Sequence, residues 1–277
     1  MFRQKSAAKN FSVDDLPSNR KEVFFDRIKN QFSVFALTGL LFFLFALPLL
    51  VDSFVFDIIV YLQSTSEGGM SDAAYYSYLV LFSGIRIPCL LILSIGCAGI
   101  FRIYRNLAWE IPVFFKEDFK EGVQKNAKPF LIVFFLLGVL GLASEAVLGN
   151  LALYELVRYL PLGILTGVIG PMFLVSLNIF NLYNAKIFEA FRLALRFFFG
   201  QFFKSVLVYI LVISPFALTF ISRFMIKYLV AIPVIILLVP ILLFAWFLFN
   251  CYLFDRYMNK ENYPEIFDKG IHRKKGL

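Results

Sequence analysis

The sequence predicts an all-α polytopic membrane protein with six transmembrane helices, and three observations carry this prediction. Of its 277 residues, 60% are hydrophobic and only 17% are charged, whereas soluble domains have roughly 25% charged residues. Phe alone contributes 36 residues. The apolar runs are continuous and lack a two-residue alternation, which favours helices over a β-barrel, the other structure that satisfies its backbone groups inside lipid.

A helix needs about 20 apolar residues to cross a hydrocarbon core of roughly 30 Å. Six stretches meet this requirement: 33–51, 78–101, 129–148, 159–181, 205–222 and 228–250. Together they form one predicted membrane domain over 33–250, between a basic N-terminal segment at 1–32 and a basic tail at 251–277. Residues 1–32 lack the apolar core of a signal peptide, so the first span is expected to act as its own insertion signal.

The distribution of positive charge predicts the topology. Seven, six, four and six of the 27 Lys and Arg residues lie in the segments 1–32, 102–128, 182–204 and 251–277, all on one side of the predicted membrane. The remaining four are Arg86, Arg158, Arg223 and Lys227. Because short cytoplasmic loops retain positive charge, both termini are predicted to be inside, as in a multi-pass protein of the bacterial cytoplasmic membrane.

Each odd-numbered span is preceded by a basic, aromatic, amphipathic stretch. Apolar residues recur every four positions there, as in Phe24, Ile28 and Phe32 before the first span, which places them on one helix face. The prediction is a set of interfacial helices on the cytoplasmic side, whose Lys and Arg side chains reach anionic lipid at about 1 kcal/mol each. The alternative is that these basic residues only fix the topology.

The longest inner segment, 102–128, contains four aromatic residues that are predicted to form a docking surface. They are Trp109, Phe114, Phe115 and Phe119, and they lie among mixed charges. Such an amphipathic surface can bind lipid or a helix of a partner protein. Nucleic acid is not an expected partner, because the positive charge is spread over four membrane-flanking segments that lack a recognition motif.

Two charged residues fall inside predicted spans at matching depth. Arg86 lies 16 residues before Arg102, and Glu145 lies 16 residues after Pro129 in the following span, which runs in the opposite direction. Both side chains are therefore predicted at the same level in the outer leaflet. An intramembrane ion pair between Arg86 and Glu145 is the structural interpretation; snorkelling to the outer surface and a substrate or proton site are the alternatives.

Small and amide side chains predict close contacts between helices. Asn178, Asn181 and Asn184 are spaced by three residues and form a predicted polar ridge, which either joins helices or binds a solute. Close helix contact is also expected along two faces of small residues, Gly138, Gly141 and Ser144 in the third span and Gly163, Gly167 and Gly170 in the fourth.

Proline residues within the spans favour one further function class. They lie at positions 48, 88, 171, 215, 233 and 240. Each removes a helical hydrogen bond, and broken helices of this kind are typical of transporters as well as ordinary in membrane bundles.

The sequence contains none of the motifs of hydrolases, metalloproteases or nucleotide-binding proteins, such as HExxH, GxSxG or the P-loop. Its single histidine, His272, lies in the tail, and each of the three cysteines is expected to be a buried, inert thiol. We therefore predict no catalytic residues, no metal site, no cofactor and no enzyme activity.

Two segments resemble a known family. The first runs from Arg86 to Phe130 and combines a small-residue patch, an Arg-containing helix end and the sequence DFKEGVQKN; the second reads GPMFLVSLNIFNLYNAKIFEAFRLAL from Gly170 to Leu195. Both are similar to the YesL-like integral membrane proteins of Gram-positive bacteria, a family of unknown function. The chain departs from that family in its N-terminal extension and in an acidic outer segment from Asp52 to Asp72.

The resemblance implies a role linked to carbohydrate uptake, since genes of that family accompany carbohydrate ABC importers. It supplies no catalytic residues. The expected function is thus a non-catalytic accessory or interaction protein, with an ABC permease and anionic lipid at the inner face as expected partners. The alternative is a small-solute transporter that uses the proline-broken helices.

Overall fold

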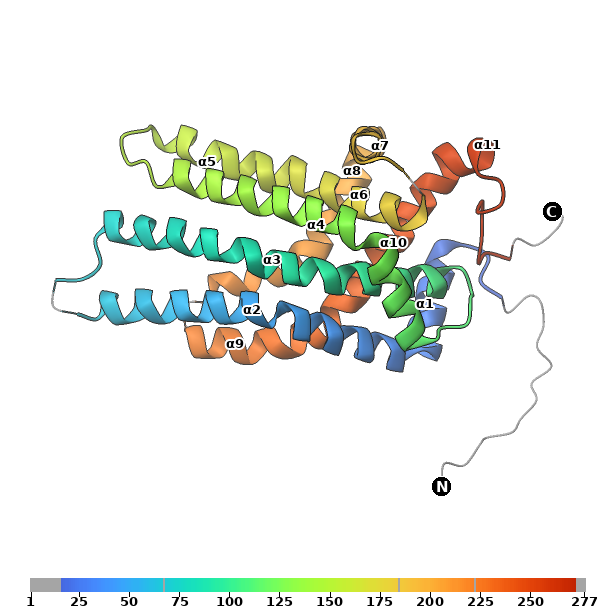
Figure 1. The fold of residues 1–277 in the computed structure, drawn as a ribbon, viewed down its shortest axis with the longest axis horizontal. Helices are drawn as coiled ribbons and strands as arrows, with labels where there is room; N and C mark the ends of the chain where they lie inside the picture. The colour runs from blue at the N-terminus through green and yellow to red at the C-terminus, as the bar shows by residue number, and fades with distance from the viewer. Residues whose placement is uncertain (1–15, 67, 184, 222, 273–277) are drawn as a thin grey trace, which may run out of the picture.

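The computed structural model describes residues 16–66, 68–183, 185–221 and 223–272 of the chain. Six segments are long and apolar enough to cross a membrane, and they confirm the predicted all-α fold (Figure 1). These are α2 (Phe32–Ser64), α3 (Asp72–Ala108), α4 (Phe115–Leu148), α5 to α6 (Glu155–Leu182), α8 with the 3₁₀ segment η3 (Phe202–Thr219), and α9 to α11 (Phe224–Asn262). The described ranges contain no strand.

Two shorter helices lie outside the spans. Helix α1 (Arg20–Asn30) has Asn19 as its N-cap, whose side chain accepts a hydrogen bond from the Glu22 amide. Its C-cap, Gln31, directly precedes α2. Helix α7 (Ile187–Gly200) follows α6 and is seen end-on in Figure 1, so it runs across the direction of the spans. The first basic stretch therefore lies mainly in α1 and the third mainly in α7, both outside the spans.

The second basic stretch differs from the prediction of a separate interfacial helix. Residues from Phe115 onward form the first turns of α4, which continues through Pro129 to Leu148. The Asp118 side chain accepts a hydrogen bond from the Phe114 amide at 2.9 Å, which satisfies one of the free amides at the start of the helix. Because no cap interrupts the chain near Pro129, the basic stretch and the span are a single helix.

The connection between the first two spans is shorter than predicted. Helix α2 continues to Ser64 and α3 begins at Asp72, so Asp52 and Asp57 of the predicted acidic outer segment lie within α2. Each of these carboxylates pairs with a cation of another span, Arg86 and Lys227 respectively. Since pairing offsets the cost of charge within a span, the acidic residues do not end the helix.

The spans are arranged as a bundle with two distinct ends (Figure 1). Helix α3 packs between α2 and α4, α9 lies beside α2, and α5 lies beside α4. We call the end that holds α1, the α3–α4 connection and the C-terminal segment 263–272 the terminal end. The end that holds residues 65–66 and 68–71, between α2 and α3, and the connection 149–154 is the loop end. Helix α10 (Val239–Phe254) crosses the bundle and contacts α1, α2, α3, α6 and α8.

An aromatic core fills the half of the bundle next to the terminal end. Phe244 of α10 lies at the centre of this core, with its ring 5.2 Å from that of Phe35 and 5.6 Å from that of Tyr104. Phe101 packs edge-on against Phe130 at 5.5 Å. All of these side chains are fully buried, whereas the loop end has only a small separate cluster around Phe56 and Phe82.

The prolines break the helix pattern only in the last three spans. Helices α2 and α3 continue through Pro48 and Pro88. By contrast, the sixth span contains a π-helical turn, η4 (Val234–Leu238), just before Pro240. Pro240 has no amide hydrogen for the Ile236 carbonyl, and Gly39 of α2 lies against that carbonyl so closely that a Cβ atom there would overlap it. A glycine in α2 thus permits the broken helix to pack.

The predicted small-residue faces are partly wrong. Positions Gly141, Gly163 and Gly167 face open space: apart from the adjacent residues and the backbone of the same helix, no atom of the described chain lies within 4 Å of a Cβ atom built there. Close helix contact does occur at the predicted Gly138 and Gly170, where a Cβ atom would lie 3.1 Å from Cγ1 of Ile87 and 2.7 Å from the Tyr209 hydroxyl. It also occurs at Gly122, outside the predicted faces, where a Cβ atom would lie 2.6 Å from Cβ of Arg102 and 2.7 Å from the Ala98 carbonyl. Sequence spacing identified glycine faces, but which face meets a neighbour depends on helix rotation.

Candidate functional site

Arg86 lies at the centre of an ion cluster within the spans. Its Nη1 atom is 3.1 Å from Oε1 of Glu145 on α4, and its Nε atom is 3.2 Å from Oδ2 of Asp52 on α2. The guanidinium carbon also lies 5.8 Å from the ring centroid of Phe56. The structure thus brings together the two residues predicted to pair and adds a third, Asp52.

The cluster has more negative than positive charge when both carboxylates are ionised. Two acceptor atoms in it, Oδ1 of Asp52 and Oε2 of Glu145, are buried and have no hydrogen-bond partner in the described chain. A buried acceptor without a donor is costly. The geometry therefore suits a proton or a donor group of a small ligand beside Arg86.

Sequence reasoning missed Asp52 because the first span was ended at Val51. The sequence does contain a signal: the apolar residues from Phe54 to Val60 follow Asp52, surround Asp57 and continue the helical pattern past the first carboxylate. Asp57 forms a second ion pair with Lys227 and accepts a hydrogen bond from the Tyr228 hydroxyl at 2.8 Å. Near the loop end, Asp52 thus connects α2 to α3, and Asp57 connects α2 to α9.

The predicted asparagine ridge divides into separate roles. Asn181 is buried, accepts a hydrogen bond from Asn126 of α4 at 3.1 Å and donates to the Phe101 carbonyl of α3 at 2.7 Å, so it joins three helices. Asn178 is also buried and donates only to the Leu174 carbonyl of its own helix, at 3.3 Å. Asn184 lies outside the described residues.

Segments from both ends of the chain interlock at the terminal end. Arg20 of α1 is buried, and its Nη2 atom lies 2.7 Å from Oδ2 of Asp255. Arg20 also donates to the Lys269 carbonyl at 2.9 Å, while the His272 amide donates to the Pro17 carbonyl at 2.9 Å. Residues 17–32 of the predicted N-terminal segment and 251–272 of the predicted tail are therefore part of one folded unit with the spans.

Glu110, in the α3–α4 connection, joins the same interlock. Its carboxylate pairs with Arg27 of α1 and lies 2.5 Å from Nε2 of His272. Burial raises the pKa of Glu110, but the hydrogen bonds from His272 and Arg27 outweigh burial and hold this pKa below its usual range. The residue therefore carries its charge at neutral pH and attaches both chain ends to α3.

The four aromatic residues predicted to form an inner docking surface differ in exposure. Phe119 packs against Gly99 and, at 5.9 Å, against the ring of Phe45, and Phe115 packs against the same core. Trp109 is half-buried between the cations of Arg105 and Lys269, at 5.0 and 4.5 Å from its ring. Only Phe114, with 67% of its surface exposed, is available for docking among these four.

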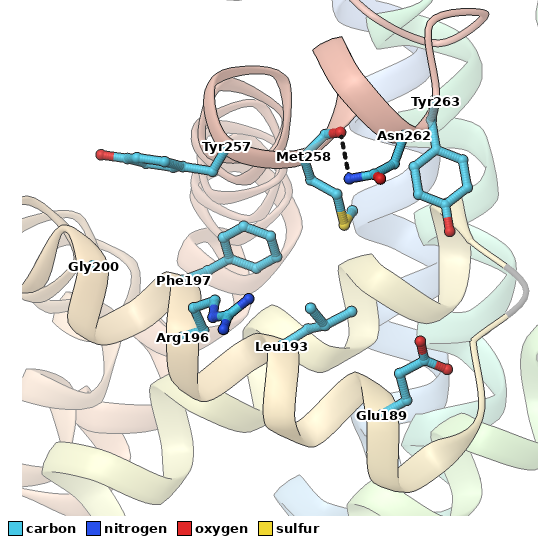
Figure 2. Close-up of a pocket in the computed structure, with 9 residues that line it drawn as sticks. All are labelled: Glu189, Leu193, Arg196, Phe197, Gly200, Tyr257, Met258, Asn262 and Tyr263. Carbon is cyan, nitrogen blue, oxygen red and sulfur yellow. Dashed lines mark hydrogen bonds between the residues drawn. The ribbon is translucent and has the colours of Figure 1, made fainter.

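A groove of about 630 Å³ lies between α7 and the end of the sixth span. Figure 2 shows Leu193 and Phe197 of α7 facing Met258, with Glu189 and Arg196 along the same helix. Asn262 donates a hydrogen bond to the Met258 carbonyl at 3.3 Å and so faces its own helix. The groove has an apolar floor and a mixed polar rim.

Candidate metal and thiol chemistry is sparse in the described ranges. They contain no group of three His, Cys, Asp or Glu side chains arranged to hold a metal ion. Cys89, Cys97 and Cys251 are all buried and free.

The six apolar spans define a multi-pass membrane protein. No family model, no curated protein and no solved structure matches the chain. Its activity must therefore be inferred from the geometry of its own residues.

Proposed function

We propose that this protein is a non-catalytic accessory protein of the bacterial cytoplasmic membrane that works through the surface of its terminal end. The observation that carries the proposal is the aromatic core around Phe244, which fills the half of the bundle next to that end. A filled half-bundle favours a function on a surface over a path for solutes. The charge distribution of the sequence predicts that this surface faces the cytoplasm.

The interlock of both chain ends supports a built surface of this kind. Ion pairs of Arg20 and Arg27 hold α1 against Asp255 of the sixth span and Glu110 at the end of α3. The segment 263–272 is held by the pair of His272 with Glu110 and by the hydrogen bond from Arg20 to the Lys269 carbonyl, an ordered arrangement for regions that in many proteins fray. Phe114 projects from the α3–α4 connection of this surface and is largely exposed. An exposed aromatic side chain among charges is suited to bind a partner's helix.

The resemblance to the YesL-like family extends the proposal to a partner class. It implies that the partner is a permease of a carbohydrate ABC importer. The test is a pulldown in mild detergent from cells grown on oligosaccharide, in which permease subunits should be recovered with the wild-type protein. Phe114→Asp should abolish this recovery.

The matched control is Tyr154→Asp, which alters an aromatic residue at the loop end that is even more exposed than Phe114, with 87% of its surface accessible. Recovery should be unchanged with this variant. If the wild type recovers no permease subunit and the purified protein instead moves solutes across reconstituted vesicles, the accessory function is wrong.

The ion cluster favours a second candidate function, a small-solute or proton-coupled transporter. Asp52 and Glu145 each keep a buried carboxylate oxygen without a partner, and such groups within spans mark ion pathways in many transporters. In reconstituted vesicles, a transporter of this kind should lose solute flux with Asp52→Asn. Equal flux in protein-free vesicles would remove this candidate.

A further inference from the structure

A second groove, of about 770 Å³, lies where α3, α4, α6 and the start of α7 meet at the terminal end. Five of its thirteen lining residues are basic. From α3, α4 and the residue before α7 these are Arg102, Arg105, Lys125, Lys128 and Lys186. Segments far apart in the sequence thus place five cations around one cavity.

Only part of this positive charge is balanced by the protein. Glu121 lies 2.5 Å from Arg102 and 2.6 Å from Lys125, and it pairs with both. The other three cations, Arg105, Lys128 and Lys186, have no carboxylate within ion-pair distance in the described part of the chain. Because like charges repel within a cavity, a bound anion would stabilise this arrangement.

Two buried donors in the lining lack acceptors. The Nε atoms of Arg102 and Arg105 are inaccessible and make no hydrogen bond in the described chain. A guanidinium group can only donate, so an acceptor is what these atoms lack. The amides of Asn126 and Asn181, which also line the groove, are already bonded to each other at 3.1 Å. The Nε atoms of Arg102 and Arg105 are therefore the donors in this lining that lack a hydrogen-bond acceptor.

The position of the groove indicates the kind of anion. Arg102 directly follows the apolar run of α3, and Pro129 begins the apolar run of α4, so the groove lies at the boundary between hydrocarbon and headgroups. Phe180, Leu182 and Ile187 supply an apolar wall. The adjacent Phe188 is 87% exposed, which extends this wall onto the outer surface of α7.

We propose that this groove binds an anionic phospholipid of the adjoining leaflet, with its phosphate group between Arg105, Lys128 and Lys186 and its acyl chains along the apolar wall. Phosphate oxygens are acceptors that match guanidinium donors, and basic pockets between spanning helices bind such headgroups in other membrane proteins. The proposal is independent of the accessory function, since lipid can bind whether or not a permease is recruited.

The test uses the full-length protein in nanodiscs and detergent. Native mass spectrometry and thermal unfolding should show retention of, and stabilisation by, phosphatidylglycerol or cardiolipin but not phosphatidylcholine, because a ligand that binds only the folded state raises the unfolding temperature. In the triple variant Arg105→Gln, Lys128→Gln, Lys186→Gln, affinity should fall by about fivefold for each cation, roughly one hundredfold in all.

A matched control separates this groove from general attraction between a basic surface and an acidic membrane. Lys29→Gln, Lys116→Gln and Lys260→Gln remove the same charge from exposed positions outside the groove, and lipid affinity should then change by less than about fivefold. The double variant Lys128→Gln, Lys186→Gln changes exposed side chains only, so its loss of lipid cannot come from misfolding.

Two results would overturn the proposal. Equal loss of affinity in the groove and control variants would show that no defined site exists. Stabilisation of the wild type by inorganic phosphate as strongly as by phospholipid would assign the groove to a soluble phosphate compound instead.

Discussion

Arg20 and Asp255 lie 235 residues apart in the chain, yet Nη2 of Arg20 is 2.7 Å from Oδ2 of Asp255 inside the protein. Both side chains are more than nine-tenths buried. Asp255 also accepts a hydrogen bond from Asn259 at 2.8 Å, and Asn259 in turn accepts one from the Tyr183 hydroxyl. This pair thus connects α1 through the sixth span to the end of α6.

Removal of one partner should destabilise the protein strongly. We expect Arg20→Met to lower the free energy of unfolding by about 3–5 kcal/mol, because Asp255 would be left buried without a counter-charge. Thermal unfolding in detergent measures the loss. The double variant Arg20→Met, Asp255→Leu should regain part of it, and Lys260→Gln, at a nearby exposed position, should have little effect. A fully additive double variant would contradict the coupling.

The geometry of the ion cluster predicts which substitution reduces the folded yield most. Arg86→Leu leaves Asp52 and Glu145 without a counter-charge, whereas Glu145→Gln leaves Arg86 paired with Asp52. Arg86→Leu should therefore reduce the folded yield in detergent more than Glu145→Gln or Asp52→Asn. The exchange Arg86→Glu with Glu145→Arg should restore only part of the yield. If either carboxylate variant is more harmful than Arg86→Leu, the cluster is not centred on Arg86.

The low pKa of Glu110 predicts an acid-sensitive attachment of the C-terminal segment. Because this pKa is lower in the folded protein than in the unfolded chain, the stabilisation is present above the ordinary Glu value of about 4.3 and is lost as the pH falls through the folded value. The protection of the amides of residues 263–272 against hydrogen exchange, taken relative to the intrinsic exchange rate at each pH, should therefore fall as the pH drops below the ordinary Glu value. With Glu110→Gln, exchange should already be fast at neutral pH; unchanged protection there would contradict this attachment.

Two glycines of α4 predict opposite effects of the same substitution. Gly122→Ala would place a Cβ atom 2.6 Å from Cβ of Arg102 and 2.9 Å from Cα of Gly99, both on α3, and we expect a loss of about 1–3 kcal/mol from this overlap. Gly141→Ala meets open space and should stabilise the helix by up to about 1 kcal/mol. Unfolding temperatures in one detergent compare them directly, and similar values would refute the close α3–α4 contact.

The sequence determined the fold class and the approximate spans. Hydropathy can be read from each stretch of sequence alone. A run of about 20 apolar residues can satisfy its backbone hydrogen bonds within a membrane only as a helix or as part of a closed barrel. The shared depth of Arg86 and Glu145 also followed from the sequence, because it depends only on the rise per residue and on the reversal of chain direction between consecutive spans.

The tertiary structure alone decided the contacts that require helix rotation and long-range folding. Whether Gly141 or Gly122 meets a neighbour depends on which face of α4 turns toward α3, and three-residue spacing is the same on either face. Asp52 became part of the Arg86 cluster because α2 continues past a carboxylate that a neighbouring helix neutralises. The pairing of Arg20 with Asp255 joins residues separated by five spans and most of the sixth. No local pattern encodes it, since it arises only when the packed helices bring both segments to one surface.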